Sequence, residues 1–95
     1  MIVVPPHAHF SPAHLAHVIA EMVRRGPPRI RAYLDETGAW FTREGTHRLR
    51  AAMALELAPI LVPVPWWREA SALRQARFAA VLRGHAFPIV TVEEL

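Results

Sequence analysis

The chain of 95 residues contains no cysteine, which excludes a disulfide, a thiolate zinc site and a cysteine nucleophile. It has no run of about 18 apolar residues, so we expect no transmembrane helix. Its first residues lack both the basic segment and the long apolar segment of a secretory signal. We therefore expect a cytoplasmic protein that does not enter a membrane.

Lysine and asparagine are also absent, and all eleven basic residues are arginine. The net charge of +3 permits contact with phosphate or nucleic acid but does not require it. The fixed charge and fork geometry of arginine do suit phosphate. The hydrophobic content of 53% argues against disorder. A chain of this length buries roughly 60–65% of its unfolded surface, so we expect residues 1–95 to form a single domain with one modest core.

The pattern of apolar residues predicts an α+β fold, a mixed β-sheet with helices in the order β-α-β-β-α-β-α-β. The expected strands are residues 2–4, 29–34, 39–42, 60–64 and 88–92, with a hairpin turn at 35–38. The expected helices are residues 12–25, about 46–57 and 66–83. Ser11 is the expected N-cap of the first helix. The adjacent Trp66 and Trp67 cannot share one face, so we expect one in the core and one partly exposed.

The segment from Gly45 to Ala52 carries an unusual charge for the start of a helix. His47, Arg48 and Arg50 fall near the first turn, where the helix dipole disfavours cations and favours anions. A glycine between a strand and a helix also lets backbone N–H groups approach a ligand closely. We therefore predict that Gly45, Thr46, His47 and Arg48 bind a phosphate-like anion. The alternative is an ordinary strand-to-helix turn with solvated arginines.

Gly45, His47, Arg48 and Ala51, followed by a helix and an apolar strand, resemble the nucleotide-binding box of the ParB/sulfiredoxin superfamily. Residues 25–31, which read Arg-Gly-Pro-Pro-Arg-Ile-Arg, lie where ParB proteins have Gly-Leu-x-Gln-Pro before a strand. The resemblance covers roughly residues 1–65. It implies an isolated ParB-like nucleotide-binding domain, without a following helix-turn-helix domain, and a nucleoside triphosphate with Mg²⁺ as the candidate ligand.

Thr46 occupies the position that is cysteine in sulfiredoxins and acidic in ParB proteins. Sulfinic-acid reduction needs a thiolate, and nucleotide hydrolysis would use the carboxylate to hold Mg²⁺ or position water. A threonine hydroxyl supplies neither. The resemblance therefore implies nucleotide binding without efficient turnover, and we name no catalytic residue.

Two further groups of residues have weaker functional interpretations. Arg29, Arg31 and Tyr33 share one strand face, and the two arginines are lesser candidates for the phosphate site, although a solvated sheet face is the favoured explanation. The four histidines His7, His9, His14 and His17 permit a transition-metal site. No cysteine or carboxylate accompanies them in sequence, so solvent-facing and loop histidines are the favoured explanation.

The function that the sequence favours is binding of a nucleotide or another phosphate group at the start of the second helix. A DNA-binding protein or ParB-like nuclease is the first alternative. A non-catalytic interaction module, for which a homodimer is one option, is the second.

Overall fold

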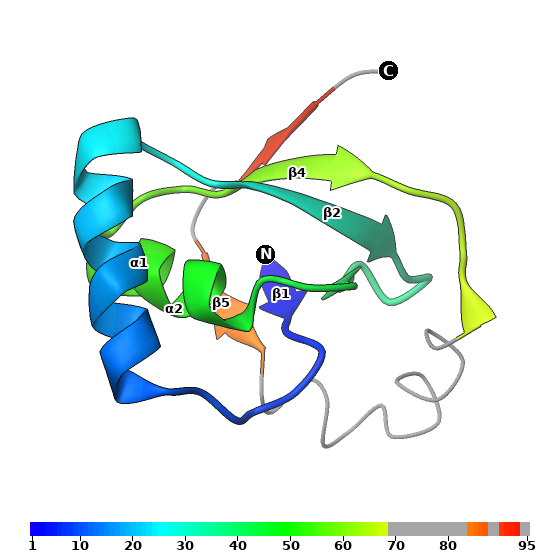
Figure 1. Ribbon diagram of the computed structural model, residues 1–95. Helices are drawn as coiled ribbons and strands as arrows, with labels where there is room; N and C mark the ends of the chain where they lie inside the picture. The colour runs from blue at the N-terminus through cyan, green and yellow to red at the C-terminus, as the bar shows by residue number, and fades with distance from the viewer. Residues whose placement is uncertain (69–83, 88–89, 94–95) are drawn as a thin grey trace.

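A computed structural model describes residues 1–68, 84–87 and 90–93. Within these ranges the chain forms an α+β fold in which helices α1 (Pro12–Arg25) and α2 (Thr46–Ala54) lie against a mixed sheet (Figure 1). The strands are β1 (Ile2–Val4), β2 (Arg29–Leu34), β3 (Trp40–Thr42), β4 (Ile60–Pro63), β5 (His85–Ala86) and β6 (Thr91–Val92). The predicted α+β class with a mixed sheet is confirmed, whereas the predicted order of elements is not.

The strands of the sheet lie in the order β5-β1-β3-β2-β4-β6. Strand β1 pairs in parallel with β3, and β4 pairs in parallel with both β2 and β6. The β2–β3 and β1–β5 pairs are antiparallel. The predicted hairpin is confirmed, because Leu34 lies opposite Trp40 and Gly38 adopts a φ of 85° in the connecting turn. That positive φ suits a residue without a Cβ.

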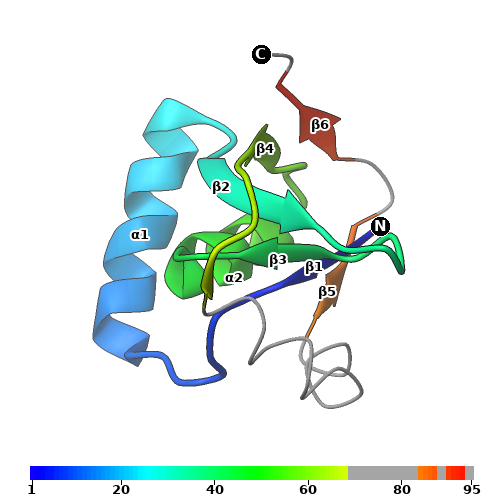
Figure 2. The same cartoon turned by 90° about the vertical axis from the view of Figure 1, so that its right-hand side faces the viewer.

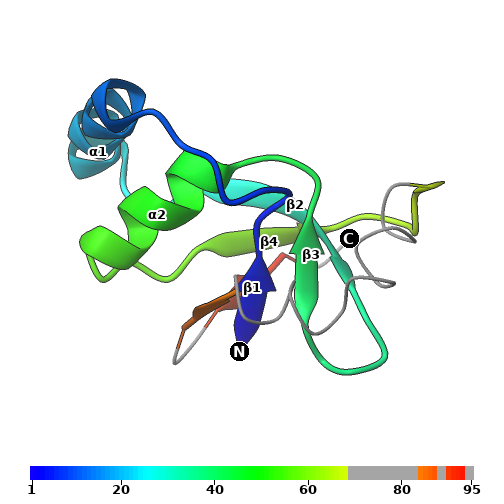
Figure 3. The same cartoon turned by 90° about the horizontal axis from the view of Figure 1, so that it is seen from below.

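Both helices cover the same face of the sheet, as Figures 2 and 3 show. The main core lies between them and includes Ile30 and Ala32 of β2 together with Leu49 of α2. A second, smaller cluster on the opposite face includes Phe41 and Trp67, with Tyr33 packed against it. Successive side chains of a strand point to opposite faces, so Arg29 and Arg31 share the Tyr33 face, away from the helices.

Local signals determine both ends of α1. The Ser11 hydroxyl accepts a hydrogen bond from the His14 N–H at 3.3 Å, and Pro12 occupies the first helical position. The helix ends at Gly26, which has a φ of 83° and whose N–H donates to the Met22 carbonyl at 2.8 Å. The prediction of a helix at 12–25 is confirmed. It could be made from sequence because the residues at both ends supply hydrogen-bond partners for the free backbone groups of the helix without help from distant parts of the chain.

Helix α2 ends at Ala54, earlier than the predicted end near Leu57. Glu56 adopts a φ of 55°, and its N–H donates to the Met53 carbonyl at 3.2 Å. The Leu57 N–H then donates to the Ala52 carbonyl at 2.9 Å. These two hydrogen bonds form a Schellman motif, which ends the helix with a left-handed residue that is usually glycine. A glutamate at this position gave no sequence signal for the turn.

The C-terminal part of the chain departs from the prediction. The expected third helix at 66–83 lies mostly outside the described residues; of those described, Trp66 and Trp67 are not helical, whereas Arg68 is. Strand β5 was not predicted. The last strand covers Thr91–Val92 rather than 88–92, and residues 88–89 lie outside the described ranges. The described elements therefore follow the order β-α-β-β-α-β-β-β.

The prediction for the two adjacent tryptophans is confirmed. Trp67 is 8% exposed and belongs to the smaller core, whereas Trp66 is 52% exposed. The described part of the chain contains no helix that is long and apolar enough to cross a membrane.

Candidate functional site

Helix α2 begins at a glycine in the left-handed conformation. Gly45 is the N-cap, with a φ of 94° and a ψ of 26°, and a Cβ there would lie 3.4 Å from Cγ2 of Ile30. The first turn contains no acidic side chain. Within residues 1–68, 84–87 and 90–93, no acceptor receives a hydrogen bond from the N–H of Thr46, His47 or Arg48. This turn therefore offers N–H groups and the positive end of the helix dipole to an anion.

Thr46 and His47 turn their side chains toward the loop between β1 and α1. Thr46 is buried, and its hydroxyl donates a hydrogen bond to the His7 carbonyl at 3.4 Å. The backbone N–H of Ser11 donates to Nε2 of His47 at 2.9 Å. Both side chains therefore hold the loop against α2.

His47 is a neutral acceptor in this arrangement. Burial lowers the pKa of His47 below its usual value of 6.5. Electrostatic repulsion from the basic side chains of His14, His7 and Arg50 lowers it further. An imidazole nitrogen that accepts a hydrogen bond carries no proton. His47 thus supports the first turn structurally, whereas the sequence interpretation assigned it a charge that neutralises an anion.

Arg48 extends from the first turn of α2 to strand β2. Its Nη1 donates to the carbonyl of Arg29 at 2.8 Å, and its Nη2 lies 3.7 Å from Oε1 of Glu44. The side chain is 38% exposed. Arg48 therefore places a guanidinium beside the start of α2 while keeping part of its surface open to a ligand.

Glu44 lies among several arginines immediately before the left-handed glycine. Arg31 Nη2 donates to Oε1 of Glu44 at 2.9 Å. This hydrogen bond is the main cause that lowers the pKa of Glu44 below its usual value of 4.5; the charges of Arg31, Arg48 and Arg43 act in the same direction, and partial burial opposes them. Several cations around one carboxylate leave an excess of positive charge next to the first turn of α2.

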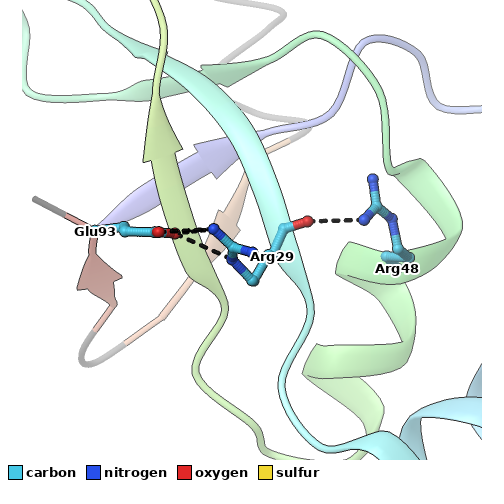
Figure 4. A network of polar contacts seen from close by, with 3 residues as sticks. All are labelled: Arg29, Arg48 and Glu93. Carbon is cyan, nitrogen blue, oxygen red and sulfur yellow. Dashed lines mark hydrogen bonds and ion pairs between the residues drawn. The ribbon is translucent and has the colours of Figure 1, made fainter. Parts of the chain in front are cut away.

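Arg29 points away from this group. Its guanidinium makes a two-pronged contact with the Glu93 carboxylate, with distances of 2.6–3.0 Å, while its backbone carbonyl accepts the hydrogen bond from Arg48 (Figure 4). The structure therefore brings Gly45, Thr46, His47 and Arg48 together and adds Arg31 through Glu44. It directs the Arg29 guanidinium to Glu93 instead, away from Glu44.

A cavity of about 470 Å³ lies beside Arg48, between the C-terminal half of α1 and the start of β2. Besides Gly26, its lining has four apolar residues, Val18, Met22, Pro27 and Pro28. It also has four charged residues, Glu21, Arg25, Arg29 and Arg48. Its volume falls in the range of small-molecule sites, which combine an apolar lining with a few polar groups. Arg48 is common to this cavity and to the first turn of α2.

The candidate histidine cluster occupies the loop and the first two turns of α1. The ring centroids of His7 and His9 are 6.3 Å apart, and those of His14 and His17 are 6.5 Å apart. The His14 ring also meets the His47 ring edge-on at 4.5 Å. Of the residues that the structure describes, no three His, Cys, Asp or Glu side chains are arranged to hold a metal ion.

Sequence reasoning did not find the ion pairs of Glu44 or the contact between Ser11 and His47. The spacing of Glu44 and Arg48 is typical of an i,i+4 ion pair, so that contact had a sequence signal. The contacts between Glu44 and Arg31 and between Ser11 and His47 join residues 13 and 36 positions apart, and no local pattern predicts them.

Comparisons with known proteins give no relative for this chain: no protein-family model, no curated protein and no solved structure matches it.

Proposed function

We propose that this protein binds a nucleotide, or a similar phosphate compound, with the phosphate at the first turn of α2. The observation that carries the proposal is the excess of arginine around Glu44, directly before a helix start whose N–H groups lack acceptors in the described ranges. Anions bind where such N–H groups and the positive end of the helix dipole coincide. Arg48 and Arg31 supply charge-assisted hydrogen bonds to phosphate oxygens.

The cavity beside Arg48 supports a ligand larger than inorganic phosphate. Arg48 lines the cavity and also belongs to the first turn of α2. A ligand whose phosphate contacts Arg48 can therefore place its base or sugar against Val18 and Met22. Apolar walls with a few charged groups suit the flat, partly polar surface of a nucleoside.

The resemblance of Gly45–Ala51 to the nucleotide-binding box of the ParB/sulfiredoxin superfamily supports the same class of ligand. The first six elements, β-α-β-β-α-β, have the order that this resemblance implies. We propose on this basis that the domain is ParB/sulfiredoxin-like and binds without efficient turnover. Mg²⁺ would enter with a triphosphate, because two arginines already hold Glu44, the carboxylate that precedes the first turn.

The DNA-binding alternative has less support. Arg29 and Arg31 are paired with Glu93 and Glu44, so the sheet face that carries them is not a continuous basic surface. Binding to duplex DNA through phosphate contacts requires such a surface and weakens steeply with salt. Sub-micromolar DNA affinity at about 150 mM salt, or metal-dependent cleavage of DNA, would favour the DNA-binding function over nucleotide binding.

Thermal unfolding with and without ligand tests the proposal. Inorganic phosphate and the common nucleoside triphosphates, the latter with Mg²⁺, should raise the melting temperature of the wild type; a ligand at about 100 times its dissociation constant adds about 2.7 kcal/mol. Arg48→Ala should remove the ligand-induced rise. Arg68→Ala is the matched control, because it removes the same charge from an exposed position after β4. Equal ligand-induced rises in Arg48→Ala and Arg68→Ala would show that the site is wrong.

A further inference from the structure

The loop between β1 and α1, residues 5–11, lies against α2 and is exposed along residues 7–11. Three hydrogen bonds join the loop to α2: Thr46 Oγ1 to the His7 carbonyl at 3.4 Å, Arg50 Nη2 to the Ala8 carbonyl at 3.1 Å, and the Ser11 N–H to His47 Nε2 at 2.9 Å. The Arg50 guanidinium also lies 3.9 Å from the centroid of the Phe10 ring. The position of this loop therefore depends on a few polar contacts and little apolar burial, which is typical of segments that open locally.

The contact between Ser11 and His47 differs from the other two in its acceptor. The other acceptors are backbone carbonyls, which do not change their protonation state near neutral pH. Nε2 of His47 is an imidazole nitrogen, and histidine titrates close to neutral pH. Ser11 is also the N-cap of α1, so this one contact joins the end of the loop, the start of α1 and the first turn of α2.

The surroundings of His47 disfavour its charged form. The groups that face it are His14 on α1, at a ring distance of 4.5 Å, His7 in the loop and Arg50 on α2. None of these groups is acidic, and His47 itself lies in the first turn of α2, near the positive end of the helix dipole. A proton on Nε2 would also turn the acceptor into a donor that faces the Ser11 N–H.

We infer that His47 is a pH-operated latch: protonation at Nε2 breaks the hydrogen bond from Ser11 and releases the end of the loop from α2. Burial and the neighbouring positive charges lower the pKa of His47 from 6.5. The latch is therefore closed at neutral pH and opens as the pH falls through the lowered pKa of His47. The latch does not depend on the anion site proposed above, because its parts are the loop, α1 and the His47 ring.

Amide hydrogen exchange in the whole protein, without ligand, tests the latch. The protection factor of the Ser11 amide is corrected for the intrinsic effect of pH on exchange. Between about pH 7.5 and pH 5 it should fall about two- to tenfold, which is the fold-change expected for one lost neutral hydrogen bond. The variant His47→Gln keeps an amide oxygen as a non-titrating acceptor, so its Ser11 protection should stay constant. His17→Gln is the matched control and should behave like the wild type.

Two results would overturn the latch: an unchanged Ser11 protection factor in the wild type, or the same loss in His47→Gln. A second measurement needs no variant and keeps the inference testable if His47→Gln does not fold. NMR titration of the wild-type histidine rings should place the His47 midpoint at the same pH as the transition of the Ser11 amide. A Ser11 transition that follows another histidine instead would contradict the assignment to His47.

Discussion

Replacing Glu44 by glutamine should move stability and phosphate affinity in opposite directions. Glu44 accepts a hydrogen bond from Arg31 at 2.9 Å and lies 3.7 Å from Arg48. Glutamine keeps the length of the side chain but removes the negative charge. The stabilising ion pairs are then lost, while Arg31 and Arg48 become available to a bound phosphate. A purely structural role for Glu44 would give the first effect without the second.

The expected size of both effects follows from exposure. The side chains of Glu44, Arg31 and Arg48 are 50%, 56% and 38% exposed, so water and salt screen their interaction. Exposed ion pairs contribute about 0.2–1 kcal/mol. We therefore expect Glu44→Gln to lower the free energy of unfolding by less than about 1 kcal/mol and to tighten phosphate binding by about 1.4- to 5-fold, the same energy expressed as affinity.

Calorimetric titration with inorganic phosphate gives the affinity, and denaturant unfolding gives the stability. Glu56→Gln is the matched control, because it makes the same change of net charge at an exposed residue beyond the other end of α2. The control should leave phosphate affinity unchanged at physiological salt, where charges that far apart are screened. Unchanged or weaker phosphate binding in Glu44→Gln, or equal tightening in both variants, would refute the anion site at this end of α2.

Three further predictions concern stability. Glu56→Gly should stabilise the protein by about 0.5–1 kcal/mol, because glycine adopts the positive φ of this exposed position without strain; urea unfolding that shows a loss would contradict this. Leu49→Ala should cost about 2–5 kcal/mol in the same assay, because Leu49 is fully buried between α2 and the sheet. The melting temperature should fall as the pH drops below 6.5, because the lowered pKa of His47 means that the unfolded chain binds more protons; His47→Gln should flatten this part of the curve.

The parts of the fold that sequence reasoning predicted well are those whose signals are local. Ser11 and Pro12 begin α1, Gly26 ends it, and Gly38 turns the β2–β3 hairpin. Each acts through its own backbone geometry or a hydrogen bond to a nearby residue. The end of α2 shows the limit of such signals, because Glu56 takes a conformation in which glycine is the usual residue.

The C-terminal strands were the least predictable elements. Strands β5 and β6 contain two residues each, which is too short for a periodic pattern. Strand β5 forms because β1 offers a free edge, and Ile2 and Val3 pair with Ala86 and His85. The N-terminal amine also donates to the Phe87 carbonyl at 2.6 Å. Pairing between the two ends of the chain depends on the sheet, which a local pattern does not contain.

For the site, the sequence by itself determined the consecutive residues Gly45 to Arg48 at a helix start, because a glycine between a strand and a helix is a local signal. Only the tertiary structure decided what their side chains do. It turns His47 toward Ser11, 36 positions away, and it directs the Arg29 guanidinium to Glu93, 64 positions away. The physical reason is range: backbone preferences act within a few residues, whereas ion pairs and side-chain hydrogen bonds form only between groups that the folded sheet and helices have already brought within about 3–4 Å.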